Sequence, residues 1–292
     1  MSAKVNLFVL LARDGRTAVI FRRGPSKQVL LIKWHLKSDT FEIGQWFKGR
    51  IYERRCDLSP SGELLAYFAA KYRKPLYSWT AISKPPYLTA LALWPNVGAW
   101  GGGGLFETEH TLLLNHGETQ SCLADGFNLK KLMKTRPLGE HSGGGEDDPI
   151  YHLRLLRDGW VLKSSGEPVK FRKSASIRFA FDPPITYEKQ SRKSANRRLQ
   201  MRVLGLAEEQ GDWYVVDYEV QDEAGVALLK LPRISWADWG GNGDLLFAER
   251  GKLFRLSWKN HQGRGRENAK ELADFGPLVF EHREAPVVAR KW

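Results

Sequence analysis

The chain has 292 residues, 42% of them hydrophobic, and a formal net charge of +12. With eleven Trp residues this composition excludes a disordered chain, and the length suits one large all-β domain. Two cysteines exclude a disulfide-rich secreted fold. No apolar run approaches the roughly 18 residues that cross a bilayer, so we expect a cytoplasmic protein without a membrane span.

The first third of the chain predicts two successive sets of four short β-strands. Asp-Gly, Gly-Pro-Ser and Lys-Ser-Asp turns separate the runs of the first set, and a Lys-Pro-Pro breaker lies in the second. We expect each set to form one four-stranded sheet. The runs are 5–11, 17–22, 28–34, 41–47, 54–58, 64–69, 77–82 and 88–93.

The segment 96–149 is irregular, because it holds eleven of the 28 glycines. Glycine runs lose too much conformational entropy to lie inside sheets without a reason, so we expect a Gly-rich insertion here. Strands are expected at 105–108 and 111–115, a helical turn at 129–133, and an exposed, mobile loop at 141–149.

The second half again consists of β-prone runs, with one helical turn expected at 269–275. Alternation of apolar and polar residues is clearest at 213–220, a pattern typical of a strand with one buried face. The expected strands are 151–156, 160–164, 176–181, 199–206, 213–220, 225–231, 245–249, 252–258 and 277–281.

A turn rich in Gly, Asp and Asn recurs directly before an apolar run. It occurs at 13–15, 59–63, 157–159 and 241–244, and the first three copies lie about 48 and then about 96 residues apart. This spacing predicts a repeated four-stranded unit, and hence an all-β β-propeller. Division of the length favours five four-stranded blades, and six also fit.

Two copies of this turn carry a family resemblance. The segment 57–67 resembles the Ser-Pro-Asp-Gly turn of WD40-like and TolB-like propeller repeats, and 235–247 is similar to it. The chain has no Gly-His and Trp-Asp pair at full WD40 spacing. The resemblance implies a propeller fold and nothing about catalysis. From length and composition we expect a single domain over 1–292, with the insertion at 96–149 and a basic loop at 182–198.

No motif for metal or cofactor binding stands out. His110, His116, His141, His152 and Cys122 match no compact zinc spacing, and the four glycines at 101–104 lack the remainder of a phosphate-binding motif. We therefore predict no metal and no cofactor.

An enzymatic alternative is a glycoside hydrolase on a propeller, which needs two carboxyl groups flanking a bond. Five acidic residues near strand ends are conceivable contributors, and the sequence pairs none of them, so no catalytic residue is assigned. They are Asp57, Glu107, Asp158, Asp217 and Asp238.

The stretch 163–202 concentrates the positive charge, with eleven Lys and Arg against three acidic residues. Tyr187, Phe179 and Phe181 offer aromatic faces beside these cations, a combination that neutralises phosphates and stacks on bases. The alternative is an ordinary solvated loop. The candidate basic patch consists of Lys189, Arg192, Lys193, Arg197, Arg198 and Arg202.

These observations favour a non-enzymatic interaction platform. Architecture is the main signal in the sequence, so we expect a scaffold that binds another protein within a cytoplasmic assembly, with 141–149 and 188–198 as candidate contact loops. Nucleic-acid binding through the stretch 163–202 is the first alternative. The propeller hydrolase is the second.

Overall fold

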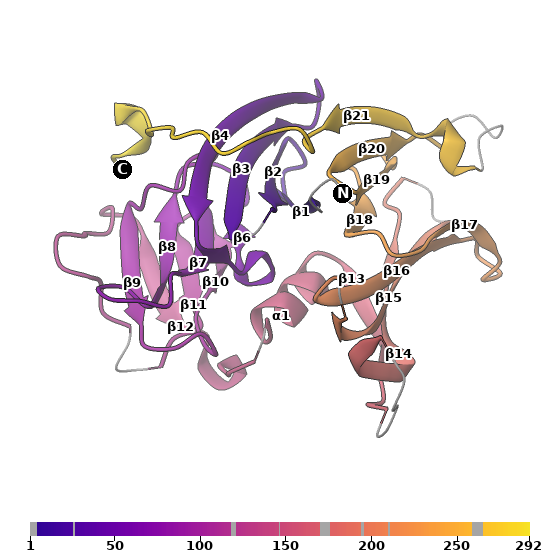
Figure 1. Ribbon diagram of the computed structural model, residues 1–292, viewed down its shortest axis with the longest axis horizontal. Helices are drawn as coiled ribbons and strands as arrows, with labels where there is room; N and C mark the ends of the chain where they lie inside the picture. The colour runs from indigo at the N-terminus through magenta and orange to yellow at the C-terminus, as the bar shows by residue number, and fades with distance from the viewer. Residues whose placement is uncertain are drawn as a thin grey trace. The chain divides into compact units, whose positions relative to one another are not determined.

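The computed structural model describes residues 5–25, 27–117, 121–145, 147–169, 176–193, 196–209, 211–258 and 265–292. Within these ranges the chain is all-β, as predicted, and its strands form five sheets (Figure 1). Each sheet is built from strands that are consecutive in the sequence. The chain divides into two compact units, Met1–Arg154 with Pro277–Trp292, and Leu155–Gly276.

Sheet 1 is an antiparallel meander of four strands in chain order. Its two central strands are buried almost throughout, because apolar side chains occupy both of their faces. Tight turns connect the strands and keep neighbours in register, for example Phe8 opposite Phe21. The strands are β1 (Asn6–Leu11), β2 (Thr17–Arg23), β3 (Gln28–His35) and β4 (Thr40–Lys48).

Sheet 2 follows in the same pattern, except that its first strand is interrupted. The predicted strand at 54–58 is partly wrong, because a short 3-10 helix, η1 (Glu53–Arg55), lies between two two-residue strands that both pair with β7. β1 contacts β6 and β3 contacts β5, so sheets 1 and 2 are neighbours within the first unit. The strands are β5 (Arg50–Ile51), β6 (Asp57–Leu58), β7 (Leu65–Ala70), β8 (Ser78–Ser83) and β9 (Ala92–Asn96).

Sheet 3 comprises β10 (Gly104–Thr108), β11 (Thr111–Leu114) and β12 (Lys134–Pro137). β12 pairs parallel to β11, because the intervening chain crosses back before it re-enters the sheet. At 129–133, where a helical turn was predicted, the chain forms a single hydrogen-bonded turn and no helix. The Met133 amide donates to the Lys130 carbonyl at 2.8 Å, and the Met133 side chain is buried in the core.

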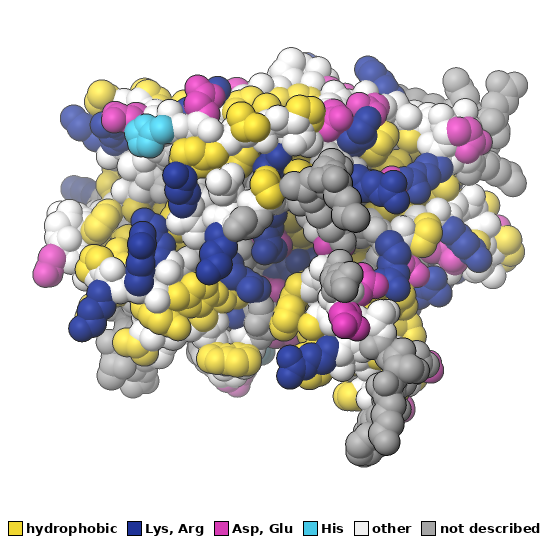
Figure 2. Space-filling model, in the orientation of Figure 1, with side chains coloured by type: hydrophobic (Ala, Val, Ile, Leu, Met, Phe, Trp, Pro, Cys, Tyr) yellow, Lys and Arg dark blue, Asp and Glu magenta, His cyan; other side chains and the backbone are white. Residues whose placement is uncertain are grey.

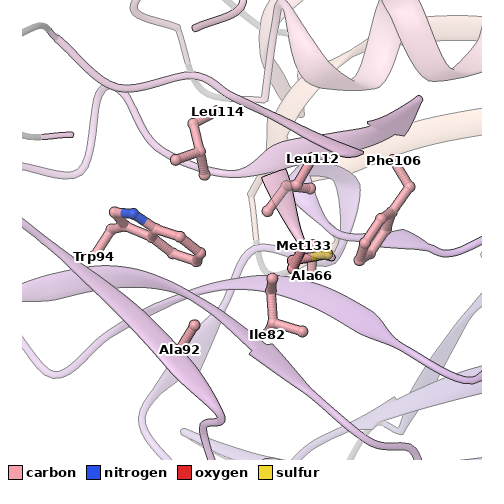
Figure 3. Packing of buried hydrophobic residues seen from close by; sticks show 8 residues of the cluster. All are labelled: Ala66, Ile82, Ala92, Trp94, Phe106, Leu112, Leu114 and Met133. Atoms are coloured by element: carbon pink, nitrogen blue, oxygen red, sulfur yellow. The ribbon is translucent and has the colours of Figure 1, made fainter. Parts of the chain in front are cut away.

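One hydrophobic core of the first unit lies between sheets 2 and 3 (Figure 3). Ala66, Ile82 and Trp94 from sheet 2 face Phe106 and Leu112 from sheet 3, and all five are almost completely buried. Two sheets thus bury their apolar faces against each other, which is the dominant stabilising contribution.

The C-terminal segment Pro277–Trp292 returns to the first unit in an extended course along β4 (Figure 1). The strand predicted at 277–281 is wrong, because these residues do not pair with a strand and the segment is held by side-chain contacts. Arg283 Nη1 donates to the Ile43 carbonyl at 3.1 Å, and Gln45 Nε2 donates to the Arg283 carbonyl at 3.1 Å. One 3-10 turn, η5 (Val287–Ala289), lies near its end.

The helix α1 (Ile150–Arg157) occupies the place of the strand predicted at 151–156. Its buried positions are Ile150, Tyr151, Arg154 and Leu155, a spacing that a helix places on one face and a strand does not. In the loop predicted at 141–149 as exposed, residues 141–144 are exposed, whereas Asp147 is buried. The 3-10 helix η3 (Gly139–His141) precedes this loop and overlaps only its first residue. Residue 146 lies outside the described residues.

The second unit contains sheet 4, a five-stranded antiparallel meander. The predicted basic loop at 182–198 is mostly not a loop, because β14 extends to Gln190 and β15 begins at Arg198. Only the hairpin connection 191–197 remains, and residues 194 and 195 lie outside the described part. The strands are β13 (Trp160–Ser165), β14 (Ile177–Gln190), β15 (Arg198–Glu208), β16 (Tyr214–Gln221) and β17 (Ala227–Leu231).

Sheet 5 completes the second unit with β18 (Trp236–Trp239), β19 (Leu245–Glu249), β20 (Lys252–Leu256) and β21 (Lys270–Asp274). A 3-10 turn, η4 (Arg266–Asn268), precedes the last strand. The helical turn predicted at 269–275 is wrong, because this segment pairs with β20 as β21.

The recurring turn has the same backbone structure in sheets 1, 2 and 5. In each, the amide of the glycine donates to the carbonyl three residues earlier, with N–O distances of 3.0 Å for Gly15, 2.8 Å for Gly62 and 2.9 Å for Gly243. Their φ angles are 71°, 78° and 85°, which favour glycine. Gly159, the fourth copy, has φ 90° but follows α1 instead of a strand.

Candidate functional site

Lys189 is the first of the six predicted basic-patch residues, and it is engaged in an ion pair. It lies on β14, and its Nζ is 2.6 Å from Asp238 Oδ1 on β18. The two side chains are only 12% and 13% exposed. The Trp239 indole donates to the Lys189 carbonyl at 3.0 Å, which joins sheets 4 and 5. Lys189 therefore has a structural role and is not presented to a ligand.

Burial raises the pKa of the Asp238 carboxyl above its ordinary value, and the negative charge of Asp158 acts in the same direction. The positive charge of Lys189 opposes this rise without cancelling it. A carboxylate and an ammonium in an apolar surrounding are costly to separate, so this pair holds the two sheets in register.

Three further predicted residues also have partners within the second unit. Arg198 Nη2 donates to the backbone carbonyls of Asp222 at 3.3 Å and Glu223 at 3.2 Å. Arg202 Nη2 is 3.9 Å from Asp217 Oδ2, and the guanidinium of Arg197 lies 4.8 Å from the centre of the Trp258 ring. These cations support the hairpin that carries them.

Arg192 and Lys193 are the two remaining residues of the predicted patch, and both are exposed at the β14–β15 connection. The structure thus places two cations at a hairpin tip and distributes the other four among internal contacts. Of the aromatic residues expected beside them, Tyr187 is buried and Phe179 is 48% exposed beside Arg178.

The first unit contains a cluster of buried arginines that was not predicted from the sequence. Arg55, on η1, is 1% exposed and donates to the carbonyls of Ala99 at 2.7 Å, Gly101 at 2.8 Å and Gly145 at 2.6 Å. Its guanidinium also lies 4.5 Å from the centre of the Tyr52 ring. One side chain thus organises two glycine-rich segments whose own sequence specifies little regular structure.

Arg154 and Arg54 extend this cluster from α1 and η1. The Arg154 guanidinium donates to the Cys56 carbonyl and lies 5.6 Å from the centres of the Phe8 and Tyr151 rings. Arg54 stacks over the same two rings at 4.9 and 5.3 Å. The arginines therefore bind backbone and aromatic rings, which is a packing role.

Glu53 balances part of this charge. Burial by itself raises the pKa of the Glu53 carboxyl. The positive charges of Arg23 and Arg54 lower this pKa, and the pKa of the folded protein is below the ordinary value. Arg23 Nη1 lies 2.7 Å from Glu53 Oε1. Glu53 is therefore an ionised, paired carboxylate in the folded protein.

The five carboxylates considered for a hydrolase all have structural partners. Asp238 pairs with Lys189 as described above. Asp57 accepts the Phe106 amide at 2.8 Å and Asp217 accepts the Arg233 amide at 2.9 Å. Two have an arginine beside them, Arg136 for Glu107 and Arg157 for Asp158.

Within the described residues, no three or more His, Cys, Asp or Glu side chains gather as a metal site would require. His116, one of the histidines considered for zinc, is buried and lies 2.7 Å from the Thr80 hydroxyl. No helix in the described ranges has the length and apolarity to span a membrane.

A second group of exposed cations and aromatic residues lies in the first unit, where the sequence analysis proposed no site. Lys71, Tyr72, Arg73 and Lys74 form the β7–β8 turn, and Trp100 lies in the following β9–β10 loop. One signal in the sequence points to them, since no Asp or Glu occurs between Glu63 and Glu107.

Comparison with known proteins assigns no identity to either surface. No family model matches the chain, and no curated protein matches its sequence.

Proposed function

We propose that this protein is a non-enzymatic, five-bladed β-propeller that serves as a platform for another protein in a cytoplasmic assembly. The observation that carries the proposal is the order of the sheets, because five sheets of sequence-consecutive strands follow one another along the described chain. In a propeller each blade is such a meander, and its strands are joined by short turns. Sheets 1 to 5 are then the five blades.

The recurring turn supports this assignment. It joins β1 to β2 in sheet 1, β6 to β7 in sheet 2 and β18 to β19 in sheet 5. Each copy has the same hydrogen bond and a glycine with positive φ. Equivalent turns at equivalent places in separate sheets are typical of repeated blades. Sheet 3, with three described strands, and sheet 4, with five, are the variants of the pattern.

The disposition of charged groups supports a platform over an enzyme. The buried side chains of Glu53, Arg55 and Asp238 are engaged in contacts that hold segments together. Exposed cations and aromatic residues are found on turns instead, where partner contacts are usually placed.

The proposal is tested by purifying the tagged full-length chain from its own cells at moderate salt after nuclease treatment. We expect one partner protein at a constant molar ratio and a complex that re-forms from the two purified components. The variant Arg192→Glu with Lys193→Glu tests the hairpin as the contact loop. A chain that elutes alone at native concentrations, with no component that rebinds, contradicts the platform function.

A further inference from the structure

The turn between β7 and β8 presents cations and aromatic rings on a rigid hairpin. The amides of Lys71 and Tyr72 both donate to the Tyr77 carbonyl at 3.0 Å, which closes the turn. The rings of Tyr72 and Tyr77 meet edge to face at 5.5 Å and are 39% and 42% exposed. Arg73 and Lys74 are exposed at the tip.

Neighbouring segments add to this group. Lys71 Nζ lies 5.7 Å from the centre of the Phe47 ring at the end of β4, and the exposed Lys48 follows Phe47. On the other side, the Tyr72 hydroxyl is 2.5 Å from the hydroxyl of Tyr52. The β7–β8 surface is defined here as Lys48, Lys71, Tyr72, Arg73, Lys74 and Tyr77.

Trp100 lies on the loop that borders this surface. The preceding residue, Ala99, packs against the cluster of Tyr52, Phe68 and Ala70. The Ser78 hydroxyl, at the base of the hairpin, donates to the Gly98 carbonyl. The loop is thus anchored to the hairpin, and the Trp100 indole is 70% exposed. An indole held open to solvent on an anchored loop is available for stacking.

The charged residues of the β7–β8 surface are all cations. No acidic residue occurs from 64 to 106, and Arg73 and Lys74 have no ion pair with any other described residue. Figure 2 shows Lys and Arg side chains interspersed with hydrophobic ones over β4, β7, β8 and β9. A surface of this kind attracts a polyanion.

The residue types favour a nucleic acid over an acidic protein. Three of the four cations are lysines, which are depleted in protein interfaces and are common phosphate ligands. Exposed Tyr and Trp rings stack on bases only where these are unpaired.

We propose that the β7–β8 surface, together with Trp100, binds single-stranded nucleic acid, with the lysines and Arg73 at phosphates and the aromatic rings against bases. This site is separate from the β14–β15 hairpin and does not depend on the proposed protein partner.

The test is fluorescence anisotropy of the full-length chain with a labelled oligothymidylate of about 20 nucleotides, longer than one binding site of this type. We expect binding that weakens steeply as salt increases. Arg73→Glu with Lys74→Glu reduces affinity at least about tenfold, because two phosphate contacts are lost. Trp100→Ala reduces it about tenfold through loss of stacking.

The matched control is Arg192→Glu with Lys193→Glu, which reverses an adjacent Arg-Lys pair at the tip of another hairpin and leaves affinity unchanged. Circular dichroism checks that each variant is folded. Three outcomes overturn the proposal: no binding at low salt, loss of binding in the control pair alone, or equal binding of a duplex or polyglutamate with no effect of Trp100→Ala. The last outcome identifies an unspecific polyanion surface or an acidic protein site.

Discussion

Aromatic rings and backbone carbonyls, as well as carboxylates, stabilise the buried arginines of this protein. Arg22, Arg54, Arg55 and Arg154 are each at most 8% exposed. Each guanidinium has aromatic rings or backbone carbonyls beside it, for example Arg22 Nη2 and the Leu278 carbonyl at 2.8 Å. A planar group with five donors suits glycine-rich backbone, whose carbonyls otherwise lack partners. Burial lowers the pKa of Arg22, and the group stays charged because its ordinary pKa is so high.

The variant Glu53→Gln tests the electrostatic balance of this cluster. It leaves Arg23 and Arg54 without their shared carboxylate, so we expect a loss of about 3 kcal/mol in the free energy of unfolding at neutral pH. Because the pKa of Glu53 is lowered by folding, its contribution is present above the ordinary value of 4.5 and disappears as pH falls through the folded value.

Urea unfolding at a series of pH values measures both effects. The wild-type protein loses stability more steeply than Glu53→Gln below about pH 4.5. Glu63→Gln, at an exposed site, is the control and follows the wild type. Identical pH slopes for Glu53→Gln and wild type contradict an ion-pair role for this carboxylate.

At the scale of the element, the C-terminal segment covers the edge of sheet 1. β4 is the last strand of that sheet, and an open edge invites pairing with other chains. The ring of Phe280 lies 5.9 Å from Trp46, and Lys48 Nζ is 4.1 Å from the centre of the Phe280 ring. Since Lys48 also belongs to the β7–β8 surface, this segment helps to position that surface.

We expect Phe280→Ala to reduce the free energy of unfolding by about 2 kcal/mol, because it removes ring packing and a cation contact. Urea unfolding followed by circular dichroism measures the loss. Val287→Ala, in the same segment and 66% exposed, is the control with a change below about 0.5 kcal/mol. An unchanged Phe280→Ala protein indicates that the segment contributes nothing to stability.

At the scale of the whole molecule, the proposed propeller ring has a thermodynamic consequence. The chain divides into two compact units, and independent units unfold separately. A closed ring joins them into one cooperative structure. Calorimetry then shows one transition of about 200 kcal/mol, with equal calorimetric and van't Hoff enthalpies. Phe106→Ala, in the core of the first unit, lowers the midpoint of that single transition. Two transitions, of which only one moves, contradict ring closure.

Strand content was predictable because it depends on local patterns. The apolar runs bounded by Gly, Asp and Pro predicted β2, β3 and β19 close to their observed bounds. The recurring turn located Gly62 and Gly243, which both have positive φ angles. The same criteria failed for α1 and β21. β21 pairs with β20, and this pairing outweighs local propensity. α1 instead buries one helical face.

The candidate site was less predictable, because charge in a sequence carries no information about what lies opposite. Lys189 and Arg192 are three residues apart in one basic run. Lys189 faces Asp238 across two sheets, and Arg192 lies exposed at a turn. Only the folded chain brings position 238 to position 189, so the pairing that removes Lys189 from the surface was not visible from spacing.

The sequence by itself determined that this protein is built of short strands joined by glycine turns, because both are local properties of the backbone. The tertiary structure decided which side chains are available to a partner. Trp94 and Trp100 are both tryptophans and lie six positions apart, yet Trp94 is 1% exposed and Trp100 is 70% exposed. The side chain of Trp94 packs against residues of sheet 3, whereas Trp100 lies in a glycine-rich loop. Burial depends on what the fold brings opposite a residue, and that is a property of the whole chain.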